Sequence, residues 1–111
     1  MTLQTHEDEG HYAKPDAAER RAIRTYLRES GVDYGAKLAD MAIEIFGEKL
    51  KIDAVQEQLP PLILEHIDQQ TEKMREGGLG KPDCKLYRKA MQRGHRARLR
   101  WHVERLRKLE Q

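Results

Sequence analysis

The chain has a single cysteine and no apolar run long enough to cross a membrane. Cys84 has no partner for an internal disulfide, which favours a reducing intracellular setting. The longest apolar cluster, around Leu59–Leu64, contains two prolines and falls far short of the roughly 20 residues that a transmembrane helix needs. The first residues also lack the basic and apolar segments of a signal peptide. We therefore expect a cytoplasmic protein without a membrane partner.

Apolar residues are scarce along the whole chain. Hydrophobic residues make up 38% of the 111 residues, and charged residues make up 36%. A chain of this length and composition has too little apolar material to bury a thick core. We expect one thin helical domain, which oligomerisation or a partner would complete.

The sequence also lacks the residue patterns of a reaction centre. Its five histidines are scattered, and none has the short Cys/His spacing of a structural zinc site. The glycines within residues 77–80 precede Lys81 but do not form the Gly-x-x-x-x-Gly-Lys-Ser/Thr pattern of a phosphate-binding loop. No nucleophile, base and orienting group can be assembled from the motifs present. We expect no enzyme activity, no cofactor, no metal and no small-molecule substrate.

What the chain does have is a strongly uneven charge distribution. Residues 81–111 contain eleven Lys or Arg against three Asp or Glu, a net charge of +8. Residues 1–80 contain the other ten bases and sixteen acids, a net charge of −6. The formal net charge of +2 therefore conceals a basic C-terminal end, which indicates a polyanion or an acidic protein face as its partner.

Apolar residues recur at helical spacing, and strand-like alternation is absent. We expect an all-α fold, a small bundle of four to five helices with a long basic C-terminal helix and a disordered acidic N-terminal tail. The expected organisation is a tail over residues 1–14, an acidic helical core over residues 15–80 and a basic helix over residues 81–111 that packs on this core.

Glycine is expected to end the first helix. Pro15 suits a first helical turn, and Gly31 should stop the helix that follows it. A second helix should begin at Asp33 and end near Gly47. This second helix is the most apolar, so we expect it to form the centre of the core. Its apolar residues are Leu38, Met41, Ala42, Ile45 and Phe46.

Proline and glycine should also interrupt the second half of the chain. Pro60 and Pro61 remove two amide donors, which predicts a short helix, a kink and a longer helix that ends near Arg75. The Gly-rich segment 77–80 should connect this helix to the basic one. Apolar residues of the basic helix change phase near Gly94, so either the helix breaks there or its two halves pack against different surfaces.

Positive side chains recur at helical spacing within the basic helix. Residues three or four apart share one face of a helix, and five of the bases follow this spacing over about 22 Å. We call these five residues, Lys85, Lys89, Arg93, Arg96 and Arg100, the cationic stripe. Guanidinium groups fork onto phosphate oxygens, and a tryptophan within a basic segment can stack on an unpaired base. The predicted function is a small non-enzymatic protein that binds DNA or RNA by backbone or shape. The predicted nucleic-acid-binding residues are Lys85, Lys89, Arg93, Arg96, Arg100, Trp101 and Arg107.

One alternative is that the chain neutralises the cationic stripe itself. The helix before the Gly-rich segment carries acids at the same spacing, and a short connection favours an antiparallel helical hairpin. The acidic stripe could then face the cationic stripe across the seam, although exposed ion pairs contribute only about 0.2–1 kcal/mol each. These acids are Glu65, Asp68, Glu72 and Glu76.

A second alternative is a helical adaptor or inhibitor that binds another protein. The candidate docking surfaces are the acidic helix and the surface formed by Trp101, Val103 and Leu106. Such a protein would be regulatory, and it could be homo-oligomeric or of the phage or mobile-element type.

Overall fold

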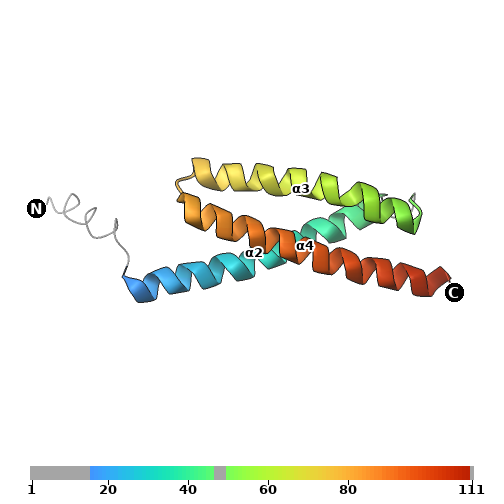
Figure 1. Ribbon diagram of the computed structural model, residues 1–111, viewed down its shortest axis with the longest axis horizontal. Helices are drawn as coiled ribbons and strands as arrows, with labels where there is room; N and C mark the ends of the chain where they lie inside the picture. Colours follow the sequence, from blue (N-terminus) through green and yellow to red (C-terminus); the bar gives the residue numbers. More distant parts are fainter. Residues whose placement is uncertain (1–15, 47–49, 111) are drawn as a thin grey trace, which may run out of the picture.

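The computed structural model describes residues 16–46 and 50–110, and these residues form three helices (Figure 1). The helices are α2 (Ala17–Phe46), α3 (Ile52–Glu76) and α4 (Lys81–Glu110). The predicted all-α class is confirmed, since no strand occurs within the described ranges. The predicted number of four to five helices is wrong, because three longer helices take their place. The expected tail over residues 1–14 lies outside the described residues.

The three helices run alternately along the long axis of the molecule (Figure 1). α2 and α4 run in the same direction and cross one another, and α3 runs antiparallel to both. α4 packs against α2 and α3, whereas α2 and α3 touch each other much less. α4 is therefore the element that holds the other two together.

Local hydrogen bonds define two of the helix boundaries. The Asp16 carboxylate accepts the amide of Glu19 at 2.8 Å and caps the first turn of α2. After α3, the Leu79 amide donates to the Met74 carbonyl and the Gly78 amide donates to the Arg75 carbonyl, both at 3.0 Å. This pair of bonds is a Schellman motif, which requires the left-handed backbone that Gly78 adopts at φ 107°. The motif reverses the chain so that α4 can return along α3.

α2 continues through Gly31, where the sequence predicted its end. Both Gly31 and Gly35 are buried against α4. A Cβ atom on Gly31 would crowd the Ala90 side chain, and one on Gly35 would overlap the Met91 carbonyl. Glycine in a helix interior costs roughly 1 kcal/mol relative to alanine, but here its missing side chain lets two backbones approach closely. Close packing therefore explains the glycines that the prediction read as helix stops.

Gly94 has the same role on α4, and the predicted break there is absent. A Cβ atom at Gly94 would overlap the Val32 carbonyl of α2. Ala90, one turn earlier, is 1% exposed. Small residues four apart on both helices thus form one narrow seam, in which the backbones lie nearly against each other.

α3 also continues through Pro60 and Pro61, so the predicted division into a short and a long helix is wrong. One face of α3 is apolar at a spacing of four residues, on both sides of the prolines. The residues of this face are at most 2% exposed, and burying each stabilises the helix by about 1.5–3 kcal/mol. Packing of this face outweighs the two missing amide donors. Its residues are Val55, Leu59, Ile63 and Ile67.

The centre of the core lies between α3 and α4 and not on the second half of α2, as the sequence suggested. Among the largest fully buried side chains are Leu59, Ile67, Met91 and His95. From the second half of α2, the fully buried residue is the small Ala39, whereas Met41 is 54% exposed. α2 contributes small residues to the close seam with α4, which leaves its large apolar residues on the outside.

Candidate nucleic-acid interface

The cationic stripe lies along α4, where Arg93 borders α2 and Arg96 and Arg100 border α3 near Pro60. All five of its side chains are exposed. Within the described residues, no ion pair joins any of them to an acid. The stripe is therefore a continuous row of positive charge in contact with solvent.

The acids of α3 have other partners or none. Asp68 accepts a hydrogen bond from the Arg88 guanidinium at 2.9 Å. Glu72 pairs with Arg75 on its own helix, and this hydrogen bond lowers the pKa of the Glu72 carboxyl. In the part of the chain that the structure describes, Glu65 and Glu76 form no ion pair. The antiparallel hairpin forms, but its acids do not neutralise the cationic stripe.

Two other side chains of α4 face α2 and pair with an acid there. Arg98 donates to the Asp40 carboxylate of α2 at 2.7 Å, and the His102 imidazole lies 2.6 Å from the same oxygen. Burial alone would raise the pKa of Asp40, but the bonds from Arg98 and His102 outweigh it and lower that pKa. Asp40 thus fixes the register between α2 and α4 at the end of the small-residue seam.

Trp101 lies on a different side of α4 from the stripe, since consecutive helical residues are about 100° apart. Its side chain is 46% exposed. The Arg98 guanidinium sits 4.1 Å above the ring centroid, Arg105 lies at 5.4 Å, and the His102 ring meets Trp101 edge-on. These guanidinium groups already use the ring face in cation–π contacts. A base that stacks on Trp101 must displace at least one of them, so the predicted stacking role remains a prediction.

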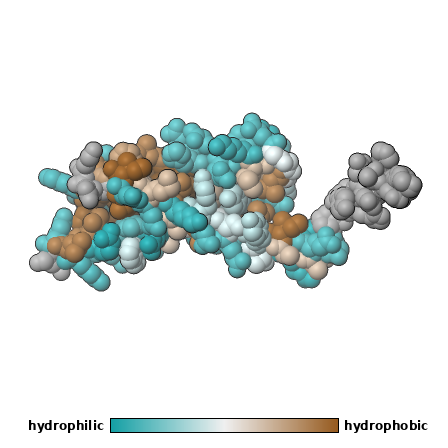
Figure 2. Space-filling model, turned by 180° about the vertical axis from the view of Figure 1, so that it is seen from behind, coloured by the Kyte–Doolittle hydropathy of each residue, from teal (hydrophilic) through white to brown (hydrophobic). Residues whose placement is uncertain are grey.

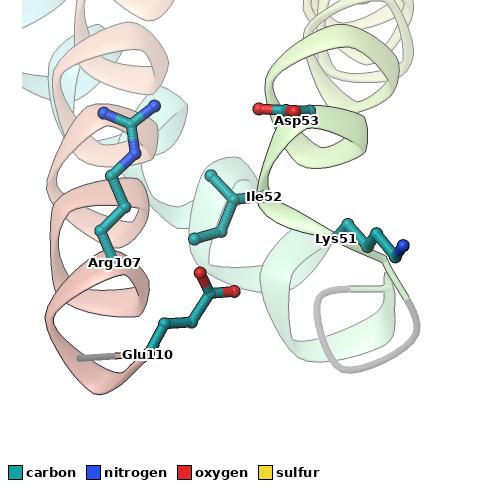
Figure 3. Close-up of a pocket in the computed structure, with 5 residues that line it drawn as sticks. All are labelled: Lys51, Ile52, Asp53, Arg107 and Glu110. Carbon is teal, nitrogen blue, oxygen red and sulfur yellow. The ribbon is translucent and has the colours of Figure 1, made fainter.

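Arg107 borders a hollow between the start of α3 and the end of α4 (Figure 3). The hollow has a volume of about 630 Å³. Figure 3 shows Ile52 and the Glu110 carboxylate turned into it, with Asp53 across from Arg107. Arg107 also donates a long hydrogen bond, 3.5 Å, to the Gln56 side chain. Arg107 is therefore set among acids and a polar partner, unlike the residues of the cationic stripe.

The fold also places one α2 cation, Arg28, beside the stripe, which the sequence analysis missed. Arg28 and Arg93 line the same surface hollow, together with Val32. Glu29 and Asp33 share this hollow without forming an ion pair to Arg93. The overlooked signal is a cluster of four arginines within nine residues, which the net negative charge of residues 1–80 conceals. This cluster is Arg20, Arg21, Arg24 and Arg28.

His95 borders the same hollow as Arg96 and Arg100 and is 1% exposed. Neither ring nitrogen has a hydrogen-bond partner within the described residues. Burial lowers the pKa of His95, and the neighbouring Arg96 charge lowers it further. His95 is therefore an uncharged core residue and not an extension of the cationic surface.

Of the adaptor surface predicted on α4, Val103 is not available. Its side chain is 4% exposed and belongs to the core, and Leu106 is half-buried. Only Trp101 of the three is exposed. Val103 and Leu106 turn toward the body of the molecule, so the surface offers only Trp101 for docking, and the adaptor role stays a prediction.

The described residues form neither of two other kinds of feature. Within residues 16–46 and 50–110, no three His, Cys, Asp or Glu side chains gather as metal ligands would. In the same residues, no helix has the length and apolarity needed to span a membrane. The chain matches no protein-family model, no curated protein and no solved structure. Function is therefore inferred from the chemistry of the surface.

Proposed function

We propose that this protein is a small non-enzymatic nucleic-acid-binding protein that holds phosphate backbones along the outer face of α4. One observation carries the proposal: the cationic stripe is exposed over its whole length and has no acid partner in the described part of the chain. Arg28 of α2 widens the same face beside Arg93.

The spacing of the cationic stripe lowers the stability of the helix itself. Lys85 and Lys89, like Arg96 and Arg100, are like-charged neighbours four residues apart, and each such pair destabilises a helix by about 0.2–0.5 kcal/mol. A row of phosphates removes this repulsion, because each cation then has an anionic partner and condensed counterions are released. This arrangement favours binding of a polyanion over a purely structural role.

The same face has no feature that reads bases. The stripe consists of lysines and arginines on α4, and no strand occurs within residues 16–46 and 50–110. We therefore assign backbone or shape recognition, on DNA or RNA, without sequence preference. We also propose a cytoplasmic location, which the single cysteine, Cys84, supports because the chain has no internal disulfide.

A mobility-shift experiment tests the proposal with three proteins. The wild-type chain should retard mixed duplex DNA or single-stranded RNA at low salt and lose this binding steeply as salt rises. The variant Arg93→Gln, Arg96→Gln, Arg100→Gln should lose retardation. A control with Lys51→Gln, Lys73→Gln and Arg75→Gln removes the same net charge from the α3 side and should retain it. Equal binding by both variants, or none by the wild type at low salt, would exclude the proposal.

A second candidate function is an adaptor or inhibitor that binds another protein. The observation that favours it is an exposed apolar groove between α2 and α3, which contains no residue of the cationic stripe. A stable complex recovered with the purified chain, and no retardation of nucleic acid, would favour this candidate instead.

A further inference from the structure

Four exposed apolar side chains lie together where the second half of α2 meets α3. Figure 2 shows hydrophobic side chains gathered at the left end of the molecule, which is the end where α2 leads into α3. The exposed fractions are 54% for Met41, 58% for Ile45, 40% for Phe46 and 43% for Leu62. We call these four residues the apolar patch.

A hollow of about 370 Å³ runs through the apolar patch. Tyr34 and Leu38 form its floor on the α2 side, and Ile63 forms it on the α3 side. The hollow includes no residue of α4. It can therefore receive apolar side chains from outside while the cationic stripe stays open.

Two opposite charges border the apolar patch on the outer edge of α2. Lys37 and Glu44 are seven residues apart, so they lie on one side of the helix, about 10 Å from each other. Met41 lies between them, four residues after Lys37 and three before Glu44. Both charged side chains are exposed, and neither forms an ion pair within the described residues.

We propose that a second copy of this chain covers the apolar patch in a two-fold symmetric dimer, with the α2 helices of the two copies antiparallel across Met41. In this arrangement Lys37 of each copy faces Glu44 of the other. The two-fold symmetry therefore creates two identical pairs of opposite charges across the interface. A two-fold interface requires such a self-complementary surface, because the same residues meet from both sides.

The contents of the patch fit this occupant. An apolar centre with a polar rim is the composition of homodimer interfaces, and the rim here carries one positive and one negative charge. A strongly acidic or basic partner would leave one of these two charges facing its own sign. Methionine also suits the symmetry axis, because its unbranched side chain adapts to a copy of itself.

The dimer would present two cationic stripes, since α4 takes no part in the interface. Dimerisation does not depend on nucleic-acid binding, so an experiment can disprove either proposal without disproving the other. Two linked stripes would raise the apparent affinity for a long polyanion above that of one stripe.

Light scattering of the full chain over a series of concentrations gives the first test. We expect a species of twice the 13.0 kDa chain mass that dissociates on dilution. Met41→Glu with Ile45→Glu should yield the monomer at every concentration. The matched control is Leu109→Glu, which changes an apolar residue that is 72% exposed at the far end of α4 and should leave the dimer intact. Circular dichroism establishes that each variant keeps its helices.

A charge exchange tests the antiparallel geometry itself. Lys37→Glu alone and Glu44→Lys alone should each weaken the dimer at least about tenfold, because each places like charges opposite one another twice. Combining both substitutions restores opposite charges and should return the dissociation constant to within about threefold of the wild type. A monomeric wild type, a dimer that survives Met41→Glu with Ile45→Glu, or a double exchange no better than the single changes would each overturn the proposal.

Discussion

The two sides of α4 show how one helix serves two opposite requirements. On the inner side, Ala90, Gly94 and His95 exclude water, and the backbone of α2 lies against that of α4. On the outer side, the cationic stripe keeps every charge in solvent. Tight packing on the inner side stabilises α4 against the like-charge repulsion along the outer side. The inner side should therefore respond to substitution through stability, and the outer side through binding.

The largest effect on stability is expected from Gly35→Ala. The new Cβ would overlap the Met91 carbonyl, so α2 and α4 must separate along the seam. We expect a loss of about 3 kcal/mol or more in the free energy of unfolding, measured by urea denaturation. The control Gly80→Ala meets only the Pro82 ring, at 3.9 Å, and should change stability by no more than about 1 kcal/mol. Equal effects at both glycines would refute a close-packed seam.

A smaller effect should appear when the pH is lowered. The pKa of buried His95 lies below the ordinary value of 6.5 in the folded chain, so the unfolded chain binds a proton first as pH falls. The contribution of neutral His95 to the free energy of unfolding is thus complete above about pH 6.5. It is lost as the pH falls toward the pKa of His95 in the folded chain. Urea denaturation at about pH 7 and about pH 5.5 measures this loss.

The substitution His95→Phe identifies the group responsible. The variant should show a weaker pH dependence over the same interval, because it removes the titrating ring from the core. Asp40 does not interfere, since its lowered pKa places its contribution to pH dependence below the ordinary value of 3.8. An unchanged pH dependence in His95→Phe would assign the effect to another residue.

The ion pair between Arg88 and Asp68 is expected to matter less. Both side chains are about half exposed, 48% and 56%, so solvent screens their attraction. Arg88→Gln should lower the free energy of unfolding by about 0.2–1 kcal/mol, and added salt should reduce the difference. A double-mutant cycle with Asp68→Asn measures the pair directly, and a coupling above that range would show that it is shielded from solvent.

The smallest change in stability is expected on the outer side of α4. Replacing Arg93, Arg96 and Arg100 by Gln removes repulsion and breaks no ion pair of the described residues, so the free energy of unfolding should stay within about 0.5 kcal/mol of the wild type. Thermal denaturation followed by circular dichroism measures it. A strong destabilisation would mean that these arginines are structural after all.

The all-α class and the residues of the cationic stripe on α4 could be predicted from the sequence, because both follow from residue spacing alone. The hairpin turn was also visible in its glycines. The helix end at Gly31 and the interruption at Pro60 were predicted wrongly, and of the two alternatives at Gly94 the break does not occur. Local preferences favour a stop at each of these residues, but contacts between helices distant in sequence override them. No single-helix pattern contains that information.

The same limit applies to the site. The five residues of the stripe could be found from their spacing, but Arg28 reaches it only because α2 crosses α4 beside Arg93. Similarly, Val103 continues the apolar spacing of Leu99 and Leu106, but the sequence does not show that the fold covers it to 4% exposure. Met41 and Ile45 were assigned to the core because they are apolar, yet the glycine seam turns a different side of α2 inward.

The most direct test of the central claim is the salt dependence of binding to duplex DNA. Five phosphate contacts predict that log K falls against log salt concentration with a slope near −4.5, at about −0.9 per contact. The variant with Arg93, Arg96 and Arg100 replaced by Gln keeps two contacts, and its slope should be about −1.8. A wild-type slope near zero, or equal slopes for the two proteins, would contradict an open row of cations that binds phosphates.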